Sequence, residues 1–154
     1  MTPAVLALRA AGVVFTVHDY AHDPRSESFG LEAATELGID PDRVYKTLMA
    51  DAGGALVVAV VPVSGRLDLK ALARAVGASK AAMADVKDAE RATGYVAGGI
   101  SPFGQKRAHR TVVDETVELW PTVYVSGGRR GLDVEIAPAD LIEVTGAIVA
   151  DVAR

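Results

Sequence analysis

Residues Val44–Val61 read VYKTLMADAGGALVVAVV, which is two apolar runs on either side of the polar stretch DAGG. Runs rich in valine and other β-formers, joined by a few residues that include glycine, are typical of a β-hairpin. The sequence therefore predicts strands over Val44–Ala50 and Ala55–Val61, with a tight turn between them.

Helices and further strands are predicted on both sides of this hairpin. Thr2-Pro3 is a favourable helix start, Gly12 a favourable helix end, and Asp68 and Asp85 are typical N-caps. The predicted helices begin at Thr2, Leu31, Asp68, Asp85 and Pro138. Besides the hairpin, the predicted strands are Val13–Tyr20, Thr111–Asp114, Thr122–Ser126 and Leu132–Ile136, and Ala147–Val152 is a final strand or tail.

The order of these elements shows no regular alternation of strand and helix. Such an order favours an α+β fold with a mixed, curved sheet over a doubly wound one. At 154 residues, half of them hydrophobic, the chain is expected to form a single domain over residues 1–154 with an aliphatic core.

Composition excludes several classes of function. The chain has no cysteine, which removes disulfides, thiolate metal sites and a protein thiol nucleophile. We find no leader peptide and no apolar run near the roughly 20 residues needed to span a bilayer, so a cytoplasmic protein with no membrane partner is expected. The net charge of −4 argues against a DNA-binding protein, and any contact with nucleic acid must be local.

Lys46 is the first candidate for chemistry. Side chains alternate along a strand, so Lys46 shares a face with the apolar Val44 and Leu48. A lysine in this place either protects a sheet edge or points into a cavity that needs a cation. The pattern alone leaves both interpretations open.

The second candidate is Gly94–Arg107, GYVAGGISPFGQKR, with four glycines and a Ser-Pro pair. It is either a wide turn or a loop whose N–H groups point inward, where they could stabilise an oxyanion. Two residues separate Ser101 from Gly104, so the spacing does not match a nucleophile elbow, and a phosphate-binding loop is excluded as well.

The third candidate is Ser126–Ile136, SGGRRGLDVEI. It is either a hairpin turn with solvated arginines or a second wall of a polar pocket, with Arg129 or Arg130 near a phosphate and Asp133 near an amine. Elsewhere we find no metal-ligand spacing, paired carboxylates or Ser/His/Asp pattern, and the three histidines are expected to be surface or hydrogen-bonded residues. Tyr20 ends a strand, where it either packs or faces a cavity.

Together, VYKTL, GYVAGGISPFGQKR and YVSGGRRGLDVEIAPADL resemble the YbaK/EbsC family of aminoacyl-tRNA editing proteins. The resemblance covers nearly the whole chain, including HDYAHDPRSESFGLEAATELG. It implies a barrel-like α+β fold and a pocket that uses no metal or other cofactor. It makes Lys46 the catalytic lysine and implies that substrate is bound by Tyr20, Gly98, Gly99, Ile100, Ser101 and Asp133.

The resemblance also implies a substrate and partners. The expected substrate is the 3′ end of a mischarged aminoacyl-tRNA, namely Cys-tRNA(Pro), and the expected partner is prolyl-tRNA synthetase. Weak tRNA contacts are expected from the local cations Lys106, Arg107, Arg110, Arg129 and Arg130. Editing of alanine or another small residue, and a non-catalytic nucleotide- or aminoacyl-binding module, remain as alternatives.

Overall fold

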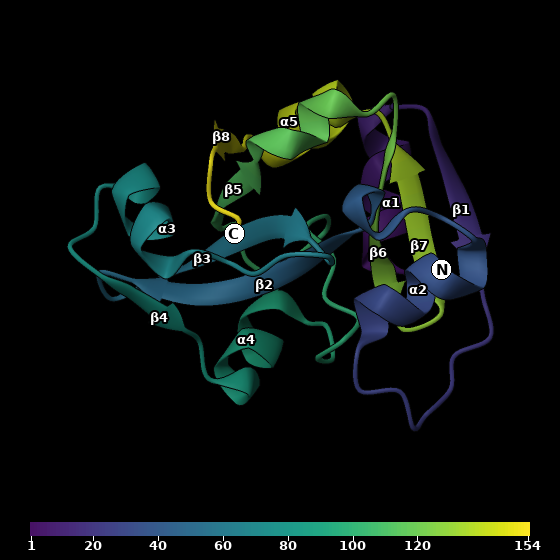
Figure 1. The fold of residues 1–154 in the computed structure, drawn as a ribbon, viewed down its shortest axis with the longest axis horizontal. Helices are drawn as coiled ribbons and strands as arrows, with labels where there is room; N and C mark the ends of the chain where they lie inside the picture. Colours follow the sequence, from purple (N-terminus) through teal and green to yellow (C-terminus); the bar gives the residue numbers. More distant parts are fainter.

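The computed structural model describes residues 1–154 and contains two β-sheets flanked by short helices (Figure 1). The helices are α1 (Pro3–Ala11), α2 (Phe29–Leu37), α3 (Leu69–Val76), α4 (Val86–Thr93) and α5 (Pro138–Thr145), with 3-10 turns at Pro41–Arg43 and Glu115–Leu119. The strands are β1 (Phe15–Asp19), β2 (Tyr45–Ala52), β3 (Ala55–Pro62), β4 (Ala81–Met83), β5 (Arg110–Asp114), β6 (Val123–Arg129), β7 (Leu132–Ile136) and β8 (Ile148–Ala150).

The predicted hairpin is the centre of the larger sheet. Strands β2 and β3 pair antiparallel along their whole length, in a five-stranded sheet with the order β4-β2-β3-β5-β8. Pairing of β3 with β5 and of β5 with β8 is parallel, so the sheet is mixed, as the sequence predicts. The short edge strand β4 is not predicted because its three residues, Ala-Ala-Met, carry no strand pattern.

The smaller sheet has the order β1-β7-β6 and is antiparallel throughout. Strand β6 runs on to Arg129, so GGRRG is not all turn. A bulge lies between Ser126 and Arg129, where Gly128 adopts a φ of +109° that favours glycine.

The two sheets are linked next to β2, because Val44, the residue before β2, forms an isolated parallel bridge with Tyr124 of β6. The sheets remain separate, however, and no closed barrel forms. The α+β class with a mixed sheet is confirmed, whereas the barrel-like description holds only loosely.

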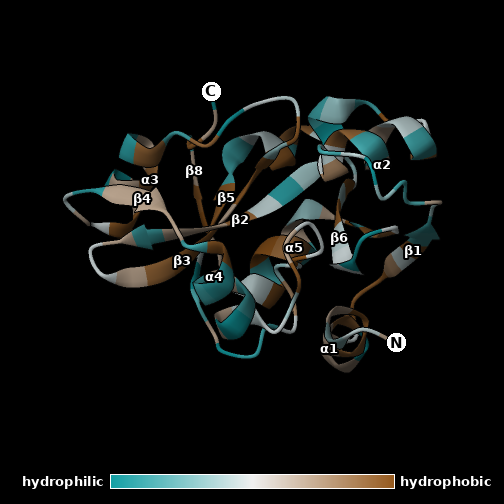
Figure 2. Ribbon diagram, turned by 90° about the horizontal axis from the view of Figure 1, so that it is seen from below, coloured by the Kyte–Doolittle hydropathy of each residue, from teal (hydrophilic) through white to brown (hydrophobic).

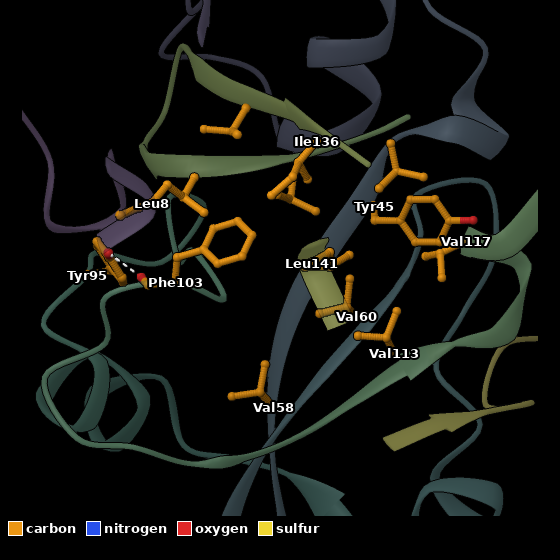
Figure 3. Close-up of a cluster of buried hydrophobic side chains, with 14 of the residues drawn as sticks. Leu8, Tyr45, Val58, Val60, Tyr95, Phe103, Val113, Val117, Ile136 and Leu141 are labelled. Carbon is orange, nitrogen blue, oxygen red and sulfur yellow. Dashed lines mark hydrogen bonds between the residues drawn. The ribbon is translucent and has the colours of Figure 1, made fainter. Parts of the chain in front are cut away.

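Side chains of β3 alternate between the two faces of the sheet and pack into two different cores. Val58 and Val60 point into the core between the two sheets, which also takes Leu8 of α1 and Phe103 of the glycine stretch (Figure 3). Val57, Ala59 and Val61 point to the opposite face, which α3 covers with Ala71 and Leu72. The hairpin is apolar on both faces because both are covered.

The helix caps follow the sequence closely. Thr2, Asp68 and Asp85 each accept a backbone N–H of the first turn, and α1, α3 and α4 end at glycines in the left-handed region. Figure 2 shows α4 as largely hydrophilic, which fits a helix that buries one narrow stripe. None of the five helices is long and apolar enough to cross a membrane.

Asp114 ties the C-terminal segment to the larger sheet. Its buried carboxylate accepts the N–H groups of Val152 and Ala153 on one oxygen and both the N–H and the hydroxyl of Thr116 on the other. Arg154 and Arg66 then exchange backbone hydrogen bonds, which places the end of the chain beside the start of α3.

Candidate functional site

A pocket of about 280 Å³ lies where β2 passes from the larger sheet to the smaller one. Between its bridge to Tyr124 and its ladder to β4, β2 has no strand on one side, and residues 44–48 line the pocket there. Other walls come from α2, β6, β7 and the glycine stretch. The lining residues are Tyr20, Glu27, Ser28, Phe29, Gly30, Ala33, Val44, Tyr45, Lys46, Thr47, Leu48, Val63, Gly98, Ile100, Ser126, Arg129 and Asp133.

Lys46 is half-buried and faces this pocket. Its ammonium donates to the carbonyl oxygen of Gly65 at 2.9 Å and has no carboxylate within 4.0 Å. Burial, and then the nearby Arg66, hold the pKa of Lys46 below its usual range. Lys46 therefore lies both in the wall of a cavity and where β2 lacks a neighbouring strand on one side.

Asp133 brings a second ionisable group to the pocket. Its side chain is buried, accepts no hydrogen bond from the protein, and burial raises its pKa to about 7. Asp133 and Lys46 do not form an ion pair, so neither neutralises the other. A carboxyl that titrates near neutrality in a pocket is a feature of functional sites.

Tyr20 lies beside Asp133. Burial, and then the Asp133 charge, raise the pKa of Tyr20 to about 12, so the phenol keeps its proton at neutral pH. Its backbone N–H donates to the Gly131 carbonyl, which holds the end of β1 against the β6–β7 turn. The phenol is thus a hydrogen-bond donor on the pocket wall.

The glycine stretch supplies free backbone donors. The N–H groups of Ala97 and Gly99 are bound to Glu90 Oε2 and to the Val96 carbonyl. The intervening Gly98 and the following Ile100 line the pocket, and their N–H groups have no acceptor in the protein. Two residues of the pocket lining therefore have backbone donors without a partner in the protein, and that these donors act on an oxyanion stays a prediction.

Close packing explains why residues 98 and 99 are glycines. A Cβ on Gly98 would lie 2.5 Å from the Phe29 ring and 2.7 Å from Arg130 Nε. A Cβ on Gly99 would lie 2.8 Å from the Cα of Arg129. The glycines let this loop touch the β6–β7 turn, and Gly99 itself does not line the pocket.

Ser101 is a correction to the predicted site. It is fully buried and does not line the pocket. Its Oγ accepts the N–H of Phe103 at 3.2 Å, and its carbonyl accepts the side-chain amide of Gln105. Ser101 shapes the Ser-Pro turn, because a hydroxyl two residues before an N–H closes a local turn.

The cations predicted to contact tRNA differ in their partners within the protein and in their distance from the pocket. Arg130 donates twice to the Ala97 carbonyl and lies 3.9 Å over the Phe29 ring, so its guanidinium is already engaged within the protein. Arg129 lines the pocket and pairs with Asp19 at 3.1 Å. Lys106 and Arg107 are exposed and unpaired, but they lie outside the pocket lining.

Sequence reasoning misses several pocket residues. Phe29 and Gly30 begin α2, Ser126 precedes the β6 bulge, and Thr47 follows Lys46 on β2. The Thr47 hydroxyl is buried and has no protein partner. No sequence signal marks these residues, since their neighbours in the pocket come from distant segments.

The pocket combines groups of a definite chemical character. An ammonium, a carboxyl with a pKa near 7, a protonated phenol and two free N–H groups surround a small cavity. These groups are suited to hold a small ester or carbonyl compound and to stabilise negative charge on its oxygen. No group of three or more His, Cys, Asp or Glu side chains is placed to hold a metal ion.

Comparison with known proteins identifies the family to which the chain belongs. Residues 27–144 match the family model described as "Aminoacyl-tRNA editing domain". The chain belongs to this family, and within it to the YbaK/EbsC proteins that the sequence resembles.

Individual relatives agree with this assignment. The chain is 39% identical over 120 residues to the "Putative Cys-tRNA(Pro)/Cys-tRNA(Cys) deacylase EbsC" of Enterococcus faecalis, covering 77% of this chain and 73% of the relative. It superposes on the solved structure of hypothetical protein APE2540 with a TM-score of 0.88, at 28% identity over 99% of both chains. It also superposes, with a TM-score of 0.82, on "a putative trans-editing enzyme for prolyl tRNA synthetase", at 25% identity over 100% of this chain and 99% of the other.

Substitution of Gly98 by alanine tests the close packing of the loop. Gly54 has nearly the same φ (+88° against +86°) but only open space where a Cβ would lie, so Gly54→Ala measures the backbone cost alone, about 1 kcal/mol. We expect Gly98→Ala to lower the free energy of unfolding by roughly a further 1–3 kcal/mol. Urea denaturation of both variants measures the difference, and equal losses would contradict the packing argument.

Replacing Asp133 by asparagine tests the pocket carboxyl through stability. Burial disfavours the charged carboxylate, so the stabilising neutral form is fully present below the usual pKa of 3.8 and is lost as the pH rises through about 7. We expect Asp133→Asn to raise the free energy of unfolding at about pH 8, by up to about 4 kcal/mol, and to change it little at about pH 4. The exposed Asp151→Asn is the control, and an equal effect of Asp133→Asn at both pH values would refute this prediction.

Proposed function

We propose that this protein removes cysteine from mischarged Cys-tRNA(Pro) by cleaving the aminoacyl ester, with the thiol of the substrate acting as nucleophile. The observation that carries the proposal is the 39% identity to EbsC over 120 residues. The protein's own groups fit the proposal, because the pocket contains a cation, a carboxyl and free N–H donors but no serine–histidine pair.

In this mechanism the pocket orients and stabilises the ester. The unused N–H groups of Gly98 and Ile100 donate to the carbonyl oxygen as it gains negative charge, and each such donor lowers the barrier by roughly 3 kcal/mol. Lys46 adds a positive charge that no carboxylate neutralises. Its partial burial strengthens the interaction, because charges attract one another more strongly where water is displaced.

The chemical step needs no water. The substrate sulfur forms a bond to its own carbonyl carbon, the ester C–O bond breaks, and the thiol proton is transferred to the departing ribose oxygen. The product is a cyclic thioester of cysteine and a free tRNA end.

Asp133, which the sequence resemblance assigns to substrate binding, is also a candidate protein base. With a pKa of about 7, Asp133 is half ionised near neutral pH and can accept the thiol proton and return it to the ribose oxygen. The same carboxylate could instead activate a water molecule, which would remove the need for a thiol. Substrates that differ only in the thiol separate these two routes.

The acidic net charge agrees with a role in which the pocket holds only the aminoacyl end of the tRNA. Selection of one tRNA over others would then come from a partner, and prolyl-tRNA synthetase is the partner we propose. The structural neighbour named as a trans-editing enzyme for that synthetase supports this choice.

Lys46→Met tests the catalytic lysine while keeping an unbranched apolar stem. We expect deacylation of Cys-tRNA(Pro) to fall at least about a hundredfold, because a charge at the reacting oxygen is lost. The free energy of unfolding should change by less than about 1 kcal/mol, since Lys46 forms no ion pair. A large loss of stability together with retained activity would assign Lys46 a purely structural role.

A panel of proline tRNAs charged with cysteine, serine or alanine tests the thiol. Cysteine and serine are nearly the same size, so an enzyme that selects the aminoacyl group by size alone would cleave both esters. We expect cysteinyl-tRNA to be cleaved and the seryl and alanyl forms to be poor substrates, with and without the synthetase. Equal cleavage of seryl-tRNA would overturn the thiol mechanism and favour water activated by Asp133.

A further inference from the structure

A groove of about 440 Å³ lies between α3 and β4, at the end of the β2–β3 hairpin opposite α2 (Figure 1). Its lining includes the exposed cations Lys70, Arg74 and Lys80, and no acidic residue. Lys70 and Arg74 are one helical turn apart and therefore lie on the same face of α3. The rest of the lining is mainly alanine, with one leucine and one serine.

The cations of the groove have no direct ion-pair partner within the protein. None of the three cations forms an ion pair within 4.0 Å. Arg66 and Arg154 are also exposed and unpaired, and they lie together at the start of α3 through their mutual backbone hydrogen bonds. The acidic residues nearest this set are Asp68 and Asp85, which cap α3 and α4, Asp151, and Asp51, which pairs with Ala82 of β4. The pKa of Asp68 is lowered first by the Ala71 N–H and then by the nearby charges of Arg154 and Arg74. The groove lining itself carries three positive charges and no negative one, in a chain of net charge −4.

The groove connects with the catalytic pocket along one face of the sheet. Lys46, Leu48 and Ala50 alternate on the face of β2 that α3 covers. The segment that leaves the pocket at Val63 passes Gly65, the acceptor of the Lys46 ammonium, and continues through Arg66 into α3. Positive side chains therefore follow one another from the pocket to the groove.

The distance suits a polynucleotide. Ala81 in the groove is paired with Ala52, which is six residues from Lys46 along β2, or about 20 Å. A stacked strand rises about 3.4 Å per nucleotide, so about six nucleotides cover this distance. That length corresponds to an unpaired 3′ end and the first base pairs that follow it.

We propose that Arg66 and the α3 groove bind the phosphate backbone of the tRNA acceptor end whose aminoacyl group occupies the pocket. The proposal rests on the proposed deacylase function and extends it to the RNA beyond the ester. Exposed cations among small side chains fit a phosphate backbone, whereas protein interfaces are centred on large apolar and aromatic residues. This proposal gives Arg130 no role in RNA binding, because its guanidinium binds the Ala97 carbonyl and lies over the Phe29 ring.

The first experiment measures binding without catalysis. The triple variant Lys70→Glu/Arg74→Glu/Lys80→Glu is compared with the control Arg9→Glu/Lys87→Glu/Arg91→Glu, which changes the net charge equally at exposed sites elsewhere. Binding of uncharged proline tRNA is measured by fluorescence anisotropy over a series of salt concentrations. We expect the groove variant to bind the tRNA at least about tenfold more weakly. The plot of log K, the association constant, against log salt should become less steep by roughly 2, while the control changes little. Unchanged affinity and slope in the groove variant would overturn the proposal.

The second experiment separates this proposal from the catalytic one. Both triple variants and a Lys106→Glu/Arg107→Glu variant are assayed on full-length Cys-tRNA(Pro) and on cysteinyl-adenosine, a small ester that cannot reach the groove. We expect the groove variant to lose activity on the tRNA and to keep it on the small ester. Three results would each contradict the groove as the RNA site. The groove variant could lose activity equally on both esters, or lose it only when the synthetase is present, or activity on the tRNA could fall only in the Lys106/Arg107 variant. If the unmodified protein cleaves neither ester, the catalytic proposal fails and the binding experiment still tests the groove.

Discussion

The structure of the pocket depends on one contact, the close approach of the Gly98–Gly99 segment to the Arg129–Arg130 turn. Gly99 packs against the main chain of Arg129 and Arg130 at the bulged end of β6, and Gly98 packs against the side chains of Phe29 and Arg130. Arg130 closes the contact by binding the Ala97 carbonyl and covering the Phe29 ring. This contact joins three segments that are far apart in sequence and fixes the wall that faces Lys46.

The same contact decides which N–H groups remain free. Hydrogen bonds at Ala97 and Gly99 hold the loop, and the N–H groups of Gly98 and Ile100 between and after them have no acceptor in the protein. Donors that are already oriented need no reorganisation as charge develops on an oxygen. Lys46 and Asp133 show a related feature, since each is partly or wholly buried without an opposite charge beside it. Such groups cost stability, and a substrate between them would offset that cost.

The positive charges of this protein are unevenly distributed over the fold. The chain is acidic overall, yet cations follow one face of the β2–β3 sheet from the pocket to α3. Several other arginines serve the fold, as Arg43 does by binding Thr122 and Arg130 by binding Ala97. Counting charges in the sequence cannot separate these two groups, because ion pairs and carbonyl partners are set by the fold.

Local patterns in the chain are enough to predict most of the secondary structure, the α+β class, the central hairpin and the family. They consist of valine-rich runs around DAGG, caps such as Asp68 and Asp85, and glycines that end helices. The motifs also point to Lys46, Tyr20 and Asp133, all of which line the pocket. Other properties of the site are visible only in the folded chain: the burial of Ser101 in its own turn, the place of Phe29 in the pocket, and the near-neutral pKa of Asp133. Burial and cross-strand neighbours control these properties, and both arise when distant segments pack together.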